Sequence, residues 1–377
     1  MQTSPSDCSD PRILIVAAEA SSCMYACRFI EQWHQRHPEW TFFGIGDRKM
    51  QSMGMNCFGF AEDLAVVGLL EVIKHWGDIK GSADRILAEC EKRKPQFALL
   101  LDYPGFNLRL AKKLHQMNIP VVYYISPQLW AWKKGRVRQV KDFVDDMMVV
   151  FPFEVDFYQS HGVQAHFVGH PLVEVVEDEN IATEPSQGKR VLGLMPGSRK
   201  SEIQYNFQEQ VKAAKLLQEQ LDIDVKVLVA PTLDLKDLQA QCENCKFEFI
   251  QGPPTQMIQQ CDVILAASGT ATLQVALCEK PMVVMYRMNP ITAFFAKRLV
   301  NTVEYFCIVN LIARRKLVEE LFQGEARGTN LASALLPLLK DEKIYQSAVE
   351  NLKVLKSKLG GGGATSNLVS YLEAKYL

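Results

Sequence analysis

The sequence lacks several features that would restrict its function at once. No apolar run approaches the ~18 residues that a membrane-spanning helix needs, and residues 1–12 lack the basic and apolar regions of a signal peptide. The net charge is only −1, which argues against wholesale binding of nucleic acid. Hydrophobic residues make up 48% of the chain and charged residues 23%, as is typical of a globular protein. We therefore expect a cytoplasmic protein without a spanning segment.

The ten cysteines lack the spacing of a disulfide or metal framework. Cys242 and Cys245 make one CxxC pair and Cys23 and Cys27 one CxxxC pair, while the others are scattered among apolar residues. A zinc site would need a second pair, or histidines at ligand spacing, near Cys242. We expect free, mostly buried thiols in a reducing compartment, and no metal or other cofactor.

Short apolar runs alternate with longer amphipathic patterns along the chain. Apolar residues spaced three to four apart, as in 24–37 and 108–116, indicate helices between the runs. This alternation predicts parallel, doubly wound sheets. The polar, proline-containing stretch 177–190 interrupts the alternation, which then restarts. The expected strands are Ile13–Ala17, Thr41–Ile45, Phe97–Leu101, Val121–Ile125, Asp146–Val150, Ala165–Val168, Val191–Met195, Asp224–Val229, Phe247–Ile250, Val263–Ala266 and Met282–Met285.

The expected fold class is α/β, with two Rossmann-like domains facing a cleft. A chain of 377 residues exceeds a single typical core, so two domains are the simplest arrangement. We place an N-terminal domain at 1–178, a second domain at 188–345 and a C-terminal helical tail at 346–377. The glycines 360–363 should end a helix, because glycine tolerates the left-handed cap. We expect the last helix to pack back on another element.

The segment 194–199 carries the strongest functional signal. An apolar strand runs into Pro-Gly-Ser-Arg at 196–199, and a helical pattern follows. The amides of such a small-residue turn can approach an anion closely, and the helix N-terminus adds its positive dipole. Arg199 adds a forked cation suited to two phosphate oxygens. A similar turn, 268–270, follows the strand 263–266, so the pair predicts a diphosphate bound at a switch point of the sheet.

Further motifs follow one another along nearly the whole chain. They are Gly46–Met50, Leu64–Val72, Asp102-Tyr103-Pro104, Ser126–Trp132, Pro152-Phe153-Glu154, Phe167–His170, Pro281–Met288, Asn310-Leu311 and Leu317–Leu321. Together with the two turns, this series resembles that of the lipid-A-disaccharide synthases, a family of two-domain GT-B glycosyltransferases.

The resemblance implies a reaction and its partners. In this family UDP-2,3-diacylglucosamine donates its sugar to the 6-hydroxyl of 2,3-diacylglucosamine 1-phosphate, giving lipid A disaccharide 1-phosphate and UDP. The anomeric carbon inverts, which calls for one in-line displacement with a general base and a stabilised leaving diphosphate. GT-B enzymes generally achieve this without a bound metal. Because both sugars carry acyl chains, we expect peripheral attachment to the inner membrane, and a homodimer is left open.

The resemblance also assigns roles to individual residues. Asp102 corresponds to the family's essential aspartate and is the candidate base, with Glu19 as its competitor because Glu19 also ends a strand. The residues expected to bind UDP are Gly197, Ser198, Arg199, Ser268, Gly269, Thr270, Gln274, Asn310 and Glu320. Those expected to contact the membrane or the acceptor are Val66, Val67, Leu69, Leu70, Trp130, Trp132, Lys133, Lys134 and Arg136.

Five positions depart from the family pattern. Ala18, Ser22 and Cys23 replace two glycines and an aspartate of the first family turn, Gly105 replaces an aspartate, and Gln274 replaces a glutamate. Two alternatives stay open, and these changes motivate the first of them. One is a degenerate paralogue that binds UDP-sugar or lipid without turnover. The other is an enzyme like UDP-N-acetylglucosamine 2-epimerase, which would share the phosphate turns.

Overall fold

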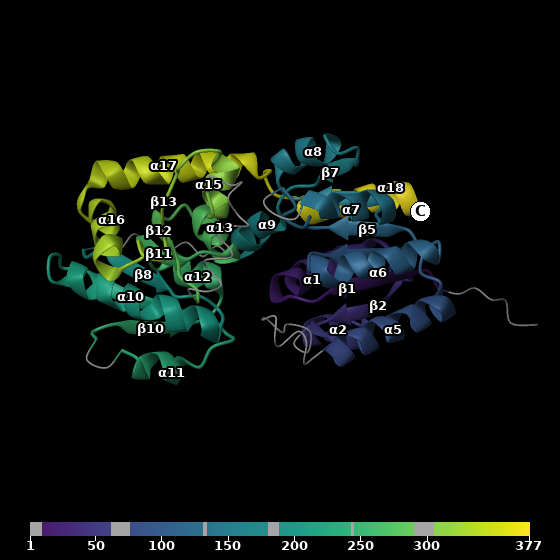
Figure 1. Cartoon of the computed structure of the whole chain (residues 1–377), viewed down its shortest axis with the longest axis horizontal. Coiled ribbons are helices and arrows are strands. Elements are labelled where there is room, and N and C mark those ends of the chain that lie inside the picture. Colours follow the sequence, from purple (N-terminus) through teal and green to yellow (C-terminus); the bar gives the residue numbers. More distant parts are fainter. Residues whose placement is uncertain (1–9, 62–75, 131–133, 180–187, 243–244, 290–304) are drawn as a thin grey trace, which may run out of the picture. The chain divides into compact units, whose positions relative to one another are not determined.

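The computed structural model of the chain describes residues 10–61, 76–130, 134–179, 188–242, 245–289 and 305–377. The chain divides into two compact units, a first unit of 1–171 with 362–377 and a second unit of 172–361. Each unit contains one parallel sheet with helices packed on it (Figure 1). The expected α/β class with two Rossmann-like domains is confirmed.

Seven strands form the sheet of the first unit, in the order β3-β2-β1-β4-β5-β6-β7 and with parallel pairing throughout. The strands are β1 (Arg12–Ala17), β2 (Thr41–Gly46), β3 (Asn56–Phe60), β4 (Phe97–Leu101), β5 (Val121–Tyr124), β6 (Asp146–Val149) and β7 (Ala165–Phe167). The helices are α1 (Ala20–Arg36), α2 (Arg48–Ser52), α5 (Trp76–Arg93), α6 (Pro104–Gln116), η1 (Lys134–Arg136), α7 (Val137–Phe143), α8 (Pro152–Gln159) and α18 (Ala364–Tyr376), with α9 (Pro171–Asp178) at the junction of the units.

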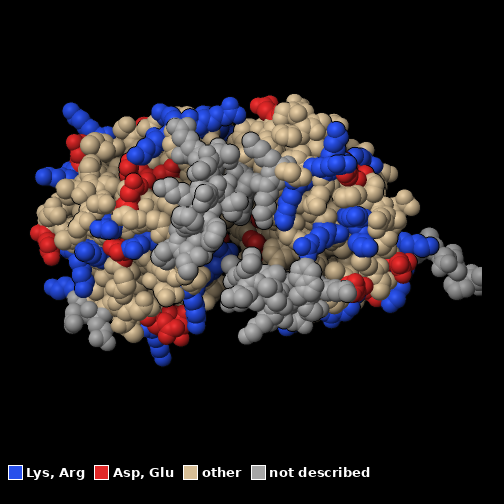
Figure 2. All heavy atoms as spheres, in the orientation of Figure 1, with Lys and Arg blue, Asp and Glu red and all other residues tan. Residues whose placement is uncertain are grey.

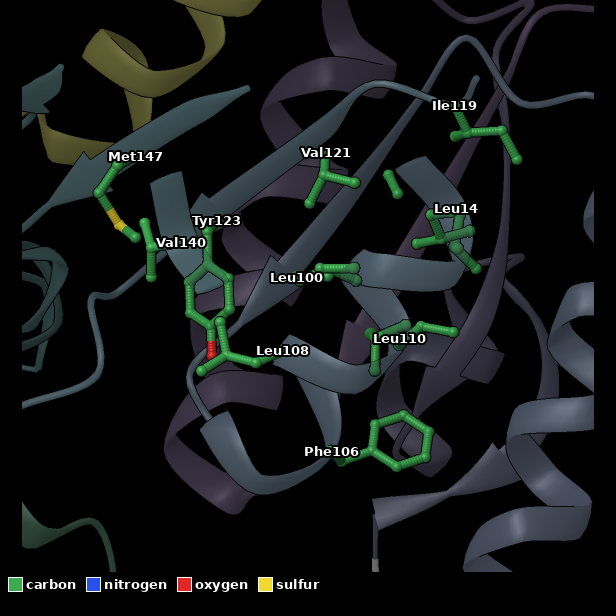
Figure 3. Packing of buried hydrophobic residues seen from close by; sticks show 14 of the residues in the cluster. Leu14, Leu100, Phe106, Leu108, Leu110, Ile119, Val121, Tyr123, Val140 and Met147 are labelled. Carbon is green, nitrogen blue, oxygen red and sulfur yellow. The ribbon is translucent and has the colours of Figure 1, made fainter. Parts of the chain in front are cut away.

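The core of the first unit lies between the central strands and the helices α5–α8. Leu100, Val121 and Tyr123 of neighbouring strands pack against Leu110 of α6 and Val140 of α7 (Figure 3). The opposite face of the sheet is covered too, because every residue of β4 is fully buried. Burial on both faces explains why the central strands are continuous apolar runs rather than alternating ones.

The last helix, α18, returns to the first unit and confirms that the chain's end packs back on another element. The buried carboxylate of Asp146 accepts hydrogen bonds from Tyr371 OH at 2.8 Å, Lys375 Nζ at 2.6 Å and Tyr376 OH at 2.5 Å. The ring of Tyr376 stacks on Phe97, with 4.7 Å between centroids. The preceding helix α17 (Glu342–Lys358) belongs to the second unit. It ends before the glycine run, where the sequence analysis expected a helix to end.

Six parallel strands form the sheet of the second unit, in the order β10-β9-β8-β11-β12-β13. The strands are β8 (Val191–Met195), β9 (Asp224–Val229), β10 (Glu248–Gln251), β11 (Val263–Ala267), β12 (Met282–Tyr286) and β13 (Glu319–Phe322). The helices besides α17 are α10 (Lys200–Gln218), α11 (Leu235–Ala240), α12 (Pro254–Gln259), α13 (Thr270–Leu277), α15 (Ile308–Ala313) and α16 (Gly328–Lys340).

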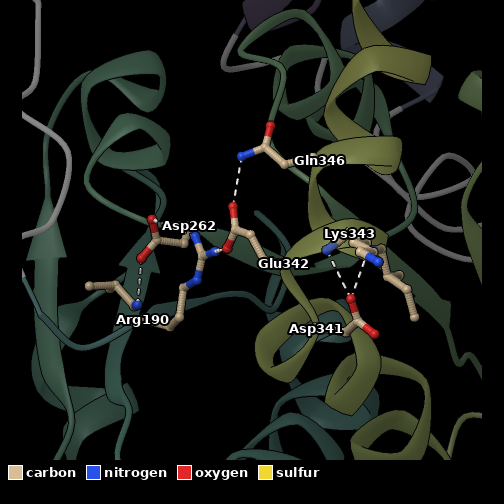
Figure 4. Close-up of polar contacts among 8 residues, drawn as sticks. Arg190, Asp262, Asp341, Glu342, Lys343 and Gln346 are labelled. Carbon is tan, nitrogen blue, oxygen red and sulfur yellow. Dashed lines mark hydrogen bonds and ion pairs between the residues drawn. The ribbon is translucent and has the colours of Figure 1, made fainter.

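Charged side chains fasten the amino ends of the strands in this unit to α17 (Figure 4). Arg190, just before β8, pairs with Asp262 before β11 at 3.7 Å and also with Glu342. Asp341 caps α17 by accepting from the amide of Lys343 at 2.8 Å. Figure 2 shows basic and acidic side chains interspersed over the visible face of this unit, in line with the small net charge.

Two strands escaped the sequence analysis, and both lie at edges of their sheets. They are β3 in the first unit and β13 in the second, and most of their residues are only partly buried. Within the described residues, no helix combines the length and the apolar character that crossing a bilayer requires.

Candidate functional site

The carboxyl ends of β1 and β4 form the switch point of the first sheet, because the strand order reverses between them. The two strands are direct neighbours, with Ala17 opposite Leu101. Glu19 follows β1 as the N-cap of α1, and Asp102 follows β4. The structure therefore brings both candidate catalytic carboxylates to one edge of the sheet, which is where open α/β sheets bind ligands.

The backbone at Asp102 adopts a conformation that ordinary residues avoid. Asp102 and Tyr103 both have left-handed φ values, of 47° and 45°. Asn107 Nδ2 holds this turn by donating to the carbonyls of Leu101 at 3.0 Å and of Asp102 at 2.8 Å. The hydroxyl of Tyr123 donates to the same Asp102 carbonyl at 2.5 Å. Such strain persists only where the surroundings enforce it, and it gathers at functional positions.

The surroundings of Asp102 raise its pKa to about 7. Burial is the main cause and the nearby Glu19 carboxylate the second, while the backbone N–H of Tyr103 opposes them. A carboxyl group that titrates near neutral pH is matched to general acid–base chemistry. Burial, followed by the charge of Asp102, also raises the pKa of the phenols Tyr25 and Tyr123, so both remain protonated.

Several buried polar atoms at this end of the sheet have unused hydrogen-bonding capacity. Among the described residues, Ser22 Oγ, Tyr25 OH and Asn107 Oδ1 have no partner. An unpaired buried polar atom costs about 1–3 kcal/mol, so such atoms are rare. Burial lowers the pKa of His170 to about 3, and its neutral ring meets Tyr25 edge-on at 6.3 Å. Tyr25 and Tyr123 were not among the residues that the sequence indicated.

The residues expected to contact the membrane or acceptor are only partly described. Trp130 is tied down, because its indole N–H donates to the buried Glu154 at 3.1 Å and its ring meets Phe153 at 5.1 Å. Arg136 is half-buried, and its charge acts on the phenol of Tyr123. Lys134 begins η1. The other six, which lie outside the described residues, are Val66, Val67, Leu69, Leu70, Trp132 and Lys133.

The second sheet has its switch point between β8 and β11. These strands are neighbours, with Met195 opposite Ala266. The turn 196–199 follows β8 and the turn 268–270 follows β11. The two turns therefore meet at one edge of this sheet. The sequence indicated that both turns could bind an anion, and we call them the anion-type turns.

The first of these turns is occupied by a side chain of its own helix. Glu202 Oε2 accepts from the amides of Ser198 at 2.9 Å and Arg199 at 3.3 Å, while Oε1 pairs with Arg199 Nη1 at 3.1 Å. Gly197 has a φ of 122°, and a Cβ at this position would lie 2.5 Å from Glu202 Oε2. Thr232 Oγ1 braces the turn by donating to the carbonyl of Ser198 at 2.8 Å. A glutamate three residues into a helix is a capping signature that could have pointed to Glu202 in the sequence.

The second turn is open by comparison. The amide of Ser268 donates to Met285 O at 2.8 Å, whereas the amides of Gly269 and Thr270 have no partner in the described part of the chain. These two amides lie at the N-terminus of α13, where a helix attracts anions. Gln274 is buried further along α13, and its Nε2 donates to Thr255 Oγ1 at 2.9 Å.

Asn310 and Glu320 lie together at the connection between α15 and β13. The fully buried Asn310 accepts from the amides of Leu317 at 2.7 Å and Val318 at 2.9 Å, and donates to Val318 O at 2.9 Å. Glu320 accepts from the amide of Cys307 at 2.7 Å, and burial raises its pKa. Asn310 would have to give up these bonds to contact a nucleotide, so in this structure it braces the segment that carries Glu320.

Two further residues support the second switch point and were missed from the sequence. Gln210 of α10 is fully buried and donates to Met195 O at 3.1 Å and Leu265 O at 3.4 Å, which fastens β8 to β11. Tyr286 ends β12 close to the Arg199–Glu202 pair. Burial is the main cause that raises the pKa of Tyr286. The charge of Glu202 is the second cause, and the charge of Arg199 opposes both.

The described residues include no group of three or more His, Cys, Asp or Glu side chains arranged to hold a metal ion. The cysteines in this part of the chain are free thiols.

Comparison with known sequences gives a consistent result. The family model described as lipid-A-disaccharide synthetase matches residues 13–363. The lipid-A-disaccharide synthase of Trichlorobacter lovleyi is 37% identical over 362 residues, which is 94% of each chain. That of Myxococcus xanthus is 36% identical over 365 residues, covering 94% of this chain and 95% of the relative.

Solved structures resemble the fold at low sequence identity. The glycotransferase of kitacinnamycin superposes with a TM-score of 0.68 at 14% identity, covering 97% of this chain and 99% of that one. A UDP-GlcNAc 2-epimerase from Neisseria meningitidis, bound to UDP-GlcNAc, gives a TM-score of 0.65 at 13% identity, covering 97% of this chain and all of that one. At these identities the likeness supports the architecture alone.

Proposed function

The chain belongs to the lipid-A-disaccharide synthase family, and from this premise we propose that it catalyses the glycosyl transfer of lipid A biosynthesis. The donor is UDP-2,3-diacylglucosamine, and the acceptor is the 6-hydroxyl of 2,3-diacylglucosamine 1-phosphate. The products are lipid A disaccharide 1-phosphate, with a β-1′,6 linkage, and UDP. Two placements carry this proposal. Asp102, whose pKa is about 7, lies at the switch point of the first sheet. The turns 196–199 and 268–270, both of a kind that binds anions, lie at the switch point of the second sheet.

Asp102 is proposed as the general base. Its carboxylate takes the proton of the acceptor 6-hydroxyl while that oxygen forms the bond to the anomeric carbon. The bond from this carbon to the UDP oxygen breaks in the same step, so the configuration inverts. A well-placed base contributes about 10²–10⁴ in rate. Burial, and after it the charge of Glu19, raises the pKa of Asp102, which makes Asp102 a stronger base than a solvated aspartate.

The leaving diphosphate is proposed to bind at the second switch point. Negative charge grows on it as the glycosidic bond breaks, and oriented donors stabilise that charge without reorganisation. The open amides of Gly269 and Thr270 and the guanidinium of Arg199 supply such donors. The nearby pair Asn310 and Glu320 is proposed to support the uridine pocket, with Glu320 as the group that reaches the nucleotide.

Acylated substrates require access to a lipid surface, so we propose peripheral attachment to the inner membrane. The apolar residues within 62–75 and the basic residues of 131–136 are the proposed contacts. Arg136 makes no ion pair within the described residues and lies near Tyr123, which supports the Asp102 turn. It is our candidate for the 1-phosphate of the acceptor.

One alternative remains specific enough to test, namely a family member that binds substrates without turnover. It is favoured by Gln274, which carries no charge and is tied to Thr255. Incubating the purified protein with both acylated sugars, and measuring UDP and disaccharide together, separates the two possibilities. UDP release without disaccharide would indicate hydrolysis, and neither product would indicate a binding protein.

Arg199→Ala tests the nucleotide site. Loss of a charged hydrogen bond costs about 1.5–3 kcal/mol, so UDP should bind about 10- to 160-fold more weakly in calorimetric titration. Arg327→Ala, which removes another exposed arginine of the same unit, is the matched control and should leave UDP affinity unchanged. Unchanged UDP affinity in a folded Arg199→Ala protein would contradict the assignment.

A further inference from the structure

The two anion-type turns of the second unit differ in what occupies their donors. At the turn 196–199, two backbone amides and one guanidinium nitrogen all point to the carboxylate of Glu202. At the turn 268–270, the amides of Gly269 and Thr270 are open within the described residues. The two turns follow neighbouring strands and have similar sequences. A carboxylate of the protein nevertheless occupies the donors of the first turn, whereas two amides of the second have no partner within the described residues.

Glu202 does more than a helix cap requires. A capping glutamate at the third helical position ordinarily reaches back to one amide, that of the N-cap residue. Here Oε2 accepts hydrogen bonds from two successive amides and Oε1 accepts one from the Arg199 guanidinium, so both oxygens of the carboxylate have partners. This is the arrangement that a phosphate with two bound oxygens would adopt at the same turn.

Gly197 makes this occupation sterically feasible. A Cβ at residue 197 would lie 2.5 Å from Glu202 Oε2 and 2.7 Å from its Cβ, closer than real atoms approach. The glutamate side chain is only 16% exposed, while that of Arg199 is 51% exposed. The carboxylate therefore folds over the turn, and the arginine stays accessible from solvent.

We propose that Glu202 is an internal anion that fills the first turn in the absence of nucleotide and is displaced by the diphosphate of UDP. The inference rests on the proposed function, since it requires the diphosphate to bind at this switch point. Entry of the diphosphate transfers the donors of Ser198 and Arg199 from the carboxylate to phosphate oxygens. No covalent bond is made or broken, and the carboxylate swings into solvent.

This exchange makes Glu202 a determinant of product release. The carboxylate remains tethered one helical turn away, so it competes with UDP at a high effective concentration. Its return to the turn restores three charge-assisted contacts and favours departure of the diphosphate. Glu202 therefore weakens UDP binding and speeds UDP dissociation after transfer.

Glu202→Gln is the direct test, because glutamine keeps the length and one neutral acceptor but removes the charge. We expect UDP to bind about 3- to 30-fold more tightly, with a correspondingly slower dissociation rate in stopped-flow measurements. Uridine, which has no phosphate, should bind unchanged. Glu219→Gln is the matched control, because it removes the same charge from an exposed position at the other end of α10, about 26 Å away. It should leave UDP affinity within twofold of the wild type.

The outcomes separate this inference from the proposed function. If Arg199→Ala weakens UDP binding and Glu202→Gln weakens it or leaves it unchanged, Glu202 is a cap and the inference is overturned while the site stands. If neither variant alters UDP binding, the nucleotide site itself is misplaced. A crystal structure of the unmodified protein with UDP gives a check that does not depend on any variant folding. Glu202 Oε2 should have left the amide of Ser198, and a retained contact would overturn the proposal.

Discussion

Asp102→Asn should lower turnover and raise stability at the same time. Asparagine has nearly the shape of aspartate, so the left-handed turn held by Asn107 and Tyr123 should be kept. What the variant loses is a carboxylate that the fold disfavours, since burial and the charge of Glu19 raise its pKa to about 7. The same environment that makes Asp102 a base at neutral pH therefore destabilises the folded protein.

The magnitude follows from linkage between protonation and folding. An ordinary aspartate titrates near 3.9, so the shift of about three units corresponds to about 4 kcal/mol in full. Because Asp102 keeps some exposure to solvent, we expect about half of this, ~2 kcal/mol. A raised pKa stabilises the fold below the unfolded pKa, and this contribution is lost as the pH rises through about 7. The advantage of the variant should thus be absent near pH 4 and complete near pH 8.

Two assays check this prediction. Denaturant unfolding at pH 4 and pH 8 should show Asp102→Asn gaining about 2 kcal/mol over the wild type at the higher pH only. Its kcat should fall about 10²–10⁴-fold with UDP affinity intact, and the wild-type kcat/KM should decline below about pH 7. A variant less stable than the wild type at pH 8 would refute the electrostatic argument. Full activity in Asp102→Asn, with none in Glu19→Gln, would assign the base to Glu19.

Two further predictions concern the last helix and the membrane. Asp146→Asn removes the charge that accepts three hydrogen bonds from α18. We expect the free energy of unfolding of the first unit to fall by about 2–3 kcal/mol and hydrogen exchange in 364–376 to become faster. Unchanged exchange there would show that apolar packing alone holds the helix. Val67→Ser with Leu69→Ser should reduce flotation with anionic liposomes without lowering the melting temperature, whereas a loss of cooperative melting would place these residues in the core.

The central strands could be predicted from the sequence, whereas two of the four edge strands, β3 and β13, could not. Parallel strands in the middle of a sheet are buried on both faces, so Phe97–Leu101 is a run of five apolar residues. The edge strands β3 and β13 have a neighbouring strand on one side only, and their sequences include polar residues and glycine. Asn56–Phe60 and Glu319–Phe322 each pair with a single neighbouring strand, β2 and β12, and this pairing orders them.

The candidate site divides in the same way. Residues in the turns that follow strands, such as Asp102 and Arg199, could be placed because parallel strands bring their carboxyl ends to one edge. The supporting residues could not, since Tyr25 and Gln210 reach the site from helices. Helical periodicity marks these positions only as inward-facing, and the atom that each side chain meets is set by packing.

The return of the last helix to the first unit also has a consequence for how the chain folds during its own translation. The surface that α18 covers, with the ring of Phe97 and the carboxylate of Asp146, is completed only after the whole second unit has left the ribosome. At typical elongation rates of about 5–20 residues per second, the stretch between residues 171 and 362 takes roughly 10–40 s to translate. During that interval the nascent first unit exposes an aromatic and acidic patch without its cover. The unit that is translated first is therefore the one that finishes folding last.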